Sequence, residues 1–274
     1  MNLRFERFTE AYFPAVQNML KQDTQNGALF LRVLQDMPSA HEIVWVDEHL
    51  VALTCRAPDD RMLMIFVAPE RRRKGIGTAI LYRAEEQFPG GKISGFYNTQ
   101  YSAAEAFAKK HGYARHYDCA YMEYTGEPFP VEPIPVRPYT DDDYLGSQSV
   151  RANAFHRMRV AVGDFPESEV AQPSEDDRRA WAEEAENYFL YIDRGEIVGV
   201  GCLTGNEIFS VSVRCDRQGQ GIGQKFVPYL ANVLLRRGYR TIALECVVGN
   251  PARRLYDRLG FQESYTERFV QKHI

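Results

Sequence analysis

The sequence predicts an α+β (mixed α/β) protein made of two tandem domains, each a mixed, mostly antiparallel sheet flanked by helices. Two observations predict this fold. Short apolar runs typical of strands alternate with longer amphipathic segments typical of helices. The order of these segments in the first half of the chain also recurs in the second half at a nearly constant spacing. Together these observations favour two domains of similar fold over one large domain.

The repeat is clearest around two glycine-rich turns. The motif RRRKGIG ends at Gly77, and the motif RQGQGIG ends at Gly223, 146 residues later. The same spacing relates Asp47 to Asp193 in the segments VWVDEHLVAL and LYIDRGEIVG. Near the end of each copy, KKHGY resembles DRLGF at a spacing of 148 residues. We therefore expect both halves to carry the same strands and helices in the same order.

The elements of the first copy follow from hydrophobic periodicity. A short strand is expected at residues 3–8, followed by helical segments in EAYFPAVQNML and ALFLRVLQDM. Strands are then expected in EIVWVD, LVALTCR and MLMIFVA, a helix in TAILYRAEEQF, a strand in KISGFY, a helix in SAAEAFAKKH and closing strands in YARHYDCAYMEY. The second copy repeats this order with NYFLYI, IVGVGCL, IFSVSV, QKFVPYLANVLLRR, TIALECV, PARRLYDRL and SYTERFVQ.

A proline-rich stretch separates the two copies. The sequence TGEPFPVEPIPVRP, residues 125–138, holds five prolines, which favour an extended connection. We predict an N-terminal domain over residues 1–127, a linker over residues 128–135 and a C-terminal domain over residues 136–274.

Composition and charge exclude several classes of protein. Hydrophobic residues make up 45% of the 274 residues, enough for a sizeable core, and the formal net charge of -4 argues against a nucleic-acid partner. The N-terminus MNLRFERFTE lacks the apolar centre of a signal peptide, and no uncharged apolar run approaches the roughly 20 residues that span a bilayer. Five cysteines without a pairing motif predict free thiols and a cytoplasmic location, and the six histidines show no metal-ligand spacing. No membrane partner and no metal are expected.

Each glycine-rich turn lies between a strand and a helix, a position suited to binding a phosphate group. The first N–H groups of a helix have no acceptor within the helix, and they carry the positive end of its dipole. Glycines at this point let an anion approach those N–H groups. Cationic side chains crowd both turns, at residues 71–74 and at Arg217 and Lys225. We predict a pyrophosphate site, although such a turn can also serve strand–helix packing and such cations can form a solvated face.

Other phosphate-binding motifs fit the turns less well. The dinucleotide fingerprint needs three glycines spaced as G-x-G-x-x-G, which GQGIGQ does not supply. A P-loop needs a lysine and a hydroxyl after its last glycine, and neither turn has them. A nucleotide-binding domain is thus the weakest alternative.

The segments VAPERRRKGIG and VRCDRQGQGIG resemble the acyl-CoA-binding signature of the GCN5-related N-acetyltransferases (GNAT), R/Q-x-x-G-x-G. The segment LECVVGNPARRLYDRLGF resembles the strand and helix that follow this signature in that family. The resemblance covers both halves, and it implies two GNAT-like domains with acetyl-CoA as the acyl donor. It also implies cofactor-binding residues, which are Val211, Val213, Gln218, Gly219, Gly221, Ile222, Gly223 and Asn250 in the second copy and Arg72, Gly75 and Gly77 in the first.

Acetyl transfer to an amine requires a base for the ammonium proton and an acid for the departing thiolate. The resemblance implies Tyr256, in RRLYDRLGF, as the acid. The candidate bases are Glu245, in the strand after the turn, and Glu207, at the start of the strand before it. We favour Glu245, because its strand should line the cleft. Structural roles stay open for all three residues: a core tyrosine and two solvated strand glutamates.

The first copy differs at each of these catalytic positions. Ala108 stands where the second copy has Tyr256, while Tyr97 and Arg61 stand where it has the two glutamates. Alanine has no proton to give. We therefore predict that the N-terminal domain is degenerate and that the C-terminal domain is catalytic.

These observations predict an acetyl-CoA-dependent N-acetyltransferase. No cysteine stands in a nucleophile motif, so the acetyl group is expected to move by direct attack in a ternary complex to a primary amine of a small molecule or peptide. The alternative is an acyl-CoA-binding sensor or scaffold without turnover. A monomer or a homodimer is expected.

Overall fold

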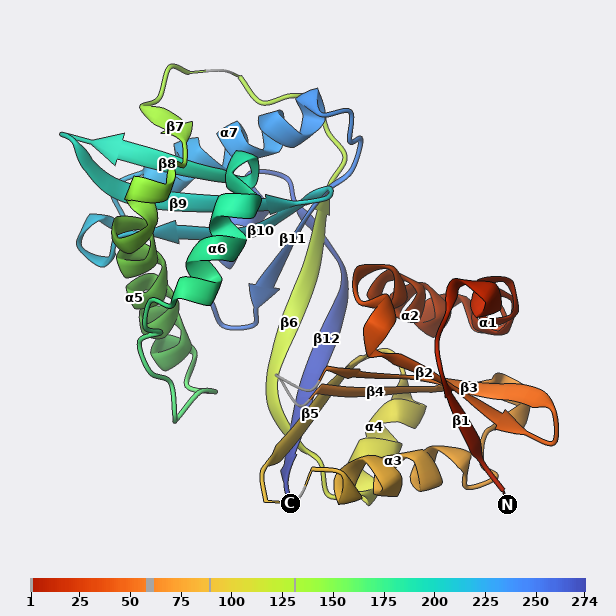
Figure 1. Cartoon of the computed structure of the whole chain (residues 1–274). Helices are drawn as coiled ribbons and strands as arrows, with labels where there is room; N and C mark the ends of the chain where they lie inside the picture. Colours follow the sequence, from red (N-terminus) through yellow and green to blue (C-terminus); the bar gives the residue numbers. More distant parts are fainter. Residues whose placement is uncertain (1, 58–61, 89, 131) are drawn as a thin grey trace. The chain divides into compact units, whose positions relative to one another are not determined.

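The computed structural model (Figure 1) describes residues 2–57, 62–88, 90–130 and 132–274. The chain forms two units, one of Met1–His116 with Arg268–Ile274 and one of Tyr117–Glu267. Two strands, β6 (Ala114–Tyr124) and β12 (Gln262–His273), each contribute residues to both units. The units therefore do not coincide with the predicted domains, whose boundaries follow the repeat in the sequence.

Unit 1 is a mixed sheet with helices on both faces. Its strand order is β1-β2-β3-β4-β5-β12, with β1 (Arg4–Arg7), β2 (His41–Val46), β3 (His49–Ala57), β4 (Met62–Val67) and β5 (Lys92–Asn98). Its helices are α1 (Phe13–Leu20), α2 (Thr24–Asp36), α3 (Ile76–Glu86) and α4 (Ser102–Lys110), with short 3-10 turns η1 (Glu10–Tyr12), η2 (Pro38–Ala40) and η3 (Pro69–Arg71). The pairs from β1 to β4 are antiparallel, and β4 and β5 are parallel.

Strand alternation divides the core of unit 1 between the two faces of its sheet. Leu53 packs with Phe30 of α2, whereas its neighbour Ala52 packs with Ile76 and Ile80 of α3. Successive strand residues point to opposite faces, so one apolar strand supplies both layers. Helices α1 and α2 accordingly cover one face, and α3 and α4 cover the other (Figure 1).

Unit 2 repeats this arrangement. Its strand order is β6-β11-β10-β9-β8-β7, with β7 (Val136–Pro138), β8 (Tyr188–Asp193), β9 (Glu196–Thr204), β10 (Glu207–Val213) and β11 (Ile242–Val247). Its helices are α5 (Tyr144–Val162), α6 (Glu175–Glu183), α7 (Ile222–Arg236) and α8 (Arg253–Arg258), with 3-10 turns η4 (Asp141–Asp143), η5 (Ala185–Asn187) and η6 (Cys215–Arg217). Strands β10 and β11 are parallel, and their neighbours are antiparallel. The predicted fold class is confirmed.

The predicted linker is not a free segment. The described residues of 128–135 form no helix or strand, but they pack along unit 2. The side-chain amide of Asn232 on α7 donates to the carbonyl of Phe129 and accepts from its N–H, both at 2.9 Å. This pair of hydrogen bonds fixes the stretch against α7.

The helices of the described residues were also compared with the length and hydropathy of a membrane span, and none of them meets both requirements.

Candidate functional site

The two glycine-rich turns adopt the same backbone conformation. Gly75 (φ 83°) and Gly221 (φ 85°) cap α3 and α7 in the left-handed region. Two residues earlier, Arg73 (φ 62°) and Gly219 (φ 78°) are also left-handed. The spacing of 146 residues found in the sequence is therefore a true structural repeat, and it holds even where an arginine replaces a glycine.

Each turn is closed by the first side chain of its R/Q-x-x-G-x-G motif. Nε of Arg72 donates to the carbonyl of Val67 at 2.9 Å, and Nε2 of Gln218 donates to the carbonyl of Val213 at 3.0 Å. Both carbonyls end the strand that enters the turn. Arg72 and Gln218, which the sequence suggests as cofactor ligands, thus hold the turn to its strand.

The two glycines of each motif serve different purposes. A Cβ on Gly75 or Gly221 would meet nothing within 4 Å, so these glycines are required by their positive φ. A Cβ on Gly77 would lie 3.4 Å from the Phe107 ring, and one on Gly223 would lie 3.2 Å from Leu255. The second glycine therefore allows α3 and α7 to pack closely on α4 and α8.

The turns have the features of an anion-binding site. The helices begin at Ile76 and Ile222, so the first N–H groups of each helix have no acceptor within it. The space in front of each capping glycine is open at the positive end of the helix dipole. An anion bound there would meet these backbone N–H groups.

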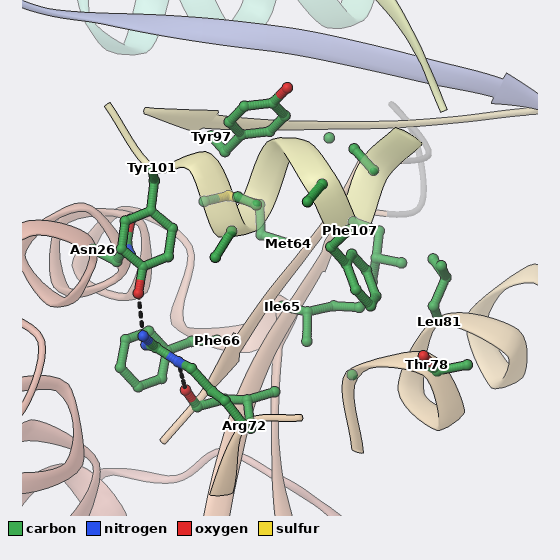
Figure 2. Close-up of a pocket in the computed structure, with 18 of the residues that line it drawn as sticks. Asn26, Met64, Ile65, Phe66, Arg72, Thr78, Leu81, Tyr97, Tyr101 and Phe107 are labelled. Carbon is green, nitrogen blue, oxygen red and sulfur yellow. Dashed lines mark hydrogen bonds between the residues drawn. The ribbon is translucent and has the colours of Figure 1, made fainter. Parts of the chain in front are cut away.

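A cavity of about 600 Å³ opens beside the turn of unit 1. Its walls come from α2, β4, the turn, α3, β5 and α4. Figure 2 shows Tyr101 and Arg72 on one side of it, with Phe107 and Leu81 on the other. Strands β4 and β5 are parallel, with Met62 in register with Ser94. Residues 63–67 of β4 and 95–97 of β5, which follow this pair, line the cavity.

A polar cluster borders the cavity next to Arg72. Oδ2 of Asp23 accepts hydrogen bonds of 2.6 Å from Nη2 of Arg72 and from the Tyr101 hydroxyl, and Nη1 of Arg72 contacts that hydroxyl (Figure 2). Burial alone would raise the pKa of Asp23, but the hydrogen bonds from Tyr101, Arg72 and Asn26 outweigh burial and lower the pKa to about 2. The cluster ties α2 to the turn and engages the Arg72 guanidinium within the protein.

Unit 2 carries the candidate proton donor on α8. Leu255 and Phe107 make the same contact with the second glycine of their turns, so the residues that follow them, Tyr256 and Ala108, are structurally equivalent. Tyr256 is buried, its ring lies edge-on to Phe261 at 6.1 Å, and burial raises the pKa of its phenol. Ala108 instead lines the cavity of unit 1.

The candidate bases lie on β11 and β10. Glu245 is exposed on β11, with Oε2 3.8 Å from Sγ of Cys119 on β6. Its neighbour Cys246 packs in the core cluster of Tyr256, so Glu245 points to the opposite face of the sheet. Glu207 is half-buried at the start of β10, in register with Ala243 of β11. Tyr256 and Glu245 therefore lie on opposite faces of the sheet of unit 2.

The remaining predicted binding residues of unit 2 lie on β10, at the start of α7 and before α8. Val211 and Val213 are half-buried in β10 and pack on the core, and Ile222 is buried at the start of α7. Oδ1 of Asn250 accepts the N–H of Ala252 at 2.9 Å, which stabilises the turn before α8. In unit 1, Tyr97 lines the cavity, and Arg61 is outside the described residues.

A bulge in β10 was not predicted from the sequence. The register of β10 with β9 shifts between Ile208 and Ser210, which leaves Phe209 without a partner in the ladder. The Phe209 side chain is 59% exposed, and bulges of this kind often re-aim side chains near active sites. In unit 1, the register of β4 with β3 is continuous from Met62 to Val67.

The face of unit 2 that carries Glu245 also holds residues from the first copy. Tyr117 and Cys119 of β6 lie there, and the Tyr117 ring packs on Phe165, which follows α5, at 4.8 Å. Burial, together with the charges of Glu245 and Glu267, raises the pKa of the Cys119 thiol. No motif in the sequence indicates these residues, because β6 was expected to close the first domain.

Among the described residues, no group of His, Cys, Asp and Glu is arranged to hold a metal ion.

Comparison with known proteins identifies the family. A model described as "Acetyltransferase (GNAT) family" matches residues 155–261, and one described as "Acetyltransferase (GNAT) domain" matches residues 40–115. The chain belongs to the GNAT acetyltransferase family and carries two of its domains in tandem. Membership supports acyl transfer from acetyl-CoA as the general activity. No curated protein matches this chain.

Several solved structures share the fold over the full chain. A GCN5-related N-acetyltransferase from Sphaerobacter thermophilus has a TM-score of 0.77 and 20% identity, covering 99% of this chain and 95% of its own. A tandem GNAT protein from the clavulanic acid biosynthesis pathway has a TM-score of 0.67 and 14% identity, and the match covers 99% of this chain and 98% of that protein. A GNAT-family acetyltransferase from Colwellia psychrerythraea has a TM-score of 0.63 and 14% identity, covering 100% of both chains. At these identities the similarity shows the fold.

Proposed function

We propose that the protein moves the acetyl group of acetyl-CoA to a primary amine by direct attack in a ternary complex, and that unit 2 is the catalytic half. One difference between the copies carries this proposal. Unit 2 has a buried tyrosine, Tyr256, at the position where unit 1 has Ala108. Unit 2 also has a bulge at Phe209 in β10, whereas the register of β4 with β3 in unit 1 is continuous. A proton donor is needed for catalysis and not for binding alone.

The side chains of unit 2 suit the two proton transfers. An amine that approaches the Glu245 face can lose its proton to Oε2 of Glu245, with Glu207 as the alternative base. The raised pKa of Tyr256 keeps its phenol protonated at neutral pH, which is the state that a proton donor to the departing thiolate requires. Bound acetyl-CoA would supply the activated acetyl thioester, with its phosphates on the N–H groups at the start of α7.

The cysteines favour direct attack over an acetyl-enzyme. Burial raises the pKa of the Cys246 thiol to about 11, and it also raises the pKa of the Cys119 thiol. Thiols that stay protonated at neutral pH are poor nucleophiles. The five cysteines are free, which also supports the proposed cytoplasmic location.

The proposed acceptor is an amine of a small molecule or peptide, without a nucleic-acid, membrane or metal partner. The proposed assembly is a monomer or homodimer.

A non-catalytic acyl-CoA sensor is the second candidate function. It is favoured by the cavity of unit 1, which lies beside an intact turn but next to Ala108. The two functions differ in turnover. Release of CoA thiol from acetyl-CoA that depends on an added amine, over a broad panel of amines, would support the enzyme. Binding of CoA without such release would support the sensor.

A further inference from the structure

We infer that the cavity of unit 1 binds an acyl-CoA whose acyl chain is longer than acetyl, and that Ala108 sets the accepted chain length. The inference rests on the part of the proposed function that places CoA at the glycine-rich turns. It adds the chemical class of the ligand in unit 1, a medium-chain acyl-CoA, to that proposal.

The lining of the cavity changes from cationic to apolar. Arg71 and Arg73 line it together with the turn, where the first N–H groups of α3 have no acceptor within the helix. The cavity is also lined by five apolar side chains that are buried and form one core cluster, Leu63, Leu81, Ala108, Tyr113 and Val270. A ligand with an anionic head and an apolar tail complements such a cavity.

Two polar groups next to the apolar cluster, the Tyr113 hydroxyl and the Lys272 ammonium, are engaged by Glu85. The Tyr113 hydroxyl donates to Oε1 of Glu85 at 3.2 Å, and Nζ of Lys272 contacts the same oxygen at 2.8 Å. With these groups engaged by Glu85, the Tyr113 ring presents an apolar surface to the cavity. An acetyl methyl group would cover little of a wall made of five apolar side chains, whereas a longer acyl chain would cover more.

Ala108 explains why this space exists in unit 1. The equivalent residue in unit 2, Tyr256, places a phenol ring in the core beside Phe261. The two positions match because Phe107 and Leu255 contact the second glycine of their turns in the same way. Replacing a phenol ring by a methyl group removes the proton donor and opens room for methylene groups, so unit 1 is suited to retain an acyl-CoA rather than to consume it.

The test is calorimetry on the full chain carrying Gly221→Glu, which blocks the turn of unit 2 and leaves that of unit 1. The probes are CoA, acetyl-CoA, butyryl-CoA and hexanoyl-CoA. Each buried methylene contributes about 0.8 kcal/mol, or roughly a fourfold change in affinity. Hexanoyl-CoA should therefore bind at least tenfold more tightly than acetyl-CoA. Equal affinities for the two, with both binding lost in an added Gly75→Glu variant, would overturn the inference.

Variants at position 108 show whether this residue sets the chain length. Ala108→Val and Ala108→Tyr should progressively remove the preference for hexanoyl-CoA while CoA itself still binds. The milder Val variant keeps the test valid if the Tyr variant does not fold, which thermal unfolding will show. An unchanged preference in a folded Val variant would refute the role of Ala108. Lack of amine-dependent turnover in unit 2 would contradict the proposed function without affecting these affinities, whereas lack of any CoA binding would overturn both.

Discussion

Arg72 donates a 2.6 Å hydrogen bond from Nη2 to Oδ2 of Asp23, so the first residue of the acyl-CoA motif is engaged by a carboxylate of its own chain. Nε of the same guanidinium is bonded to the carbonyl of Val67. The Asp23 side chain is 10% exposed, so removing either partner would leave a shielded charge without its counter-ion, which costs more than breaking a surface pair. Arg72 therefore shapes the site by fixing α2 and the turn.

Replacing Asp23 by Asn should destabilise the protein and change its pH dependence. The pKa of Asp23 is lowered from 3.8 to about 2, so its contribution to stability is complete above about pH 4 and is lost as the pH falls toward 2. A shift of this size corresponds to roughly 2 kcal/mol at neutral pH. Urea unfolding of Asp23→Asn and of the natural protein at pH 7 and pH 3 measures the contribution of Asp23 to the free energy of unfolding. A difference that does not shrink at low pH would contradict the role of the Asp23 charge.

Replacing Tyr256 by Phe should lower kcat by roughly 10²–10⁴-fold while CoA binding stays near normal. The substitution removes the phenolic proton but keeps the ring that packs on Phe261. Stopped-flow detection of released thiol measures kcat, and calorimetry measures CoA affinity. Turnover at the natural rate would assign Tyr256 to the core alone.

Replacing Glu245 by Gln should lower kcat by roughly 10²-fold and flatten the fall in rate at acidic pH, because the amide cannot accept the ammonium proton. A pH–rate profile between pH 5 and 9 measures both effects. Glu207→Gln is the matched control, since it removes a carboxylate from the neighbouring strand β10. If the control loses the acidic limb and Glu245→Gln does not, Glu207 is the base.

The sequence was sufficient to predict the repeat, the fold class and the two turns, because these depend on local signals. Strands and helices follow hydrophobic periodicity, and the turns follow glycines at positions that require positive φ, such as Gly75 and Gly221. Local signals could not predict which segments make up each unit. Strand β6 pairs with β11 of the other copy, and this pairing joins segments that are far apart in the sequence.

The candidate site likewise depends on both local and long-range features. Tyr256 and Glu245 belong to recognisable segments, and the structure puts them on opposite faces of one sheet. The bulge at Phe209 and the contact of Cys119 with Glu245 depend on the register of neighbouring strands, which the sequence of one strand does not determine. The hydrogen bond of Arg72 to Asp23 could not be predicted from the motif, because Asp23 lies 49 residues away in the sequence.

The turns of the β2–β3 and β8–β9 hairpins allow a matched comparison of how a left-handed residue affects stability. Glu48 adopts φ 61° as the second residue of the turn between β2 and β3, and Gly195 adopts φ 82° at the same place in the turn between β8 and β9. The strand ends therefore match Glu48 to Gly195, one residue beyond the spacing of 146 found in the sequence. A left-handed conformation costs a residue with a side chain about 1 kcal/mol more than glycine. Glu48→Gly should therefore stabilise the protein by about 1 kcal/mol, and Gly195→Glu should destabilise it by a similar amount. The ion pair of Glu48 with Arg4, at 3.7 Å and highly exposed, should contribute little.

Thermal unfolding monitored by circular dichroism compares these two variants with the natural protein. Glu48→Ala serves as the control, because it removes the same carboxylate without relieving the backbone. A stabilisation by Ala as large as that by Gly would attribute the effect to charge and not to φ.

Matched variants of the two turns decide which half is catalytic. Gly221→Glu places a carboxylate in the open space before α7, where the pyrophosphate is proposed to bind, so acetyl-CoA-dependent turnover should be lost. Gly75→Glu makes the same change before α3 and should leave kcat within a few-fold of the natural value, although one bound CoA per chain should disappear in native mass spectrometry. Both changes strain a residue with φ near 84°, so their costs in stability should be alike and their difference in activity should report on the sites. Loss of turnover in a folded Gly75→Glu variant, with Gly221→Glu still active, would transfer catalysis to unit 1 and make the cavity beside Ala108 the active site.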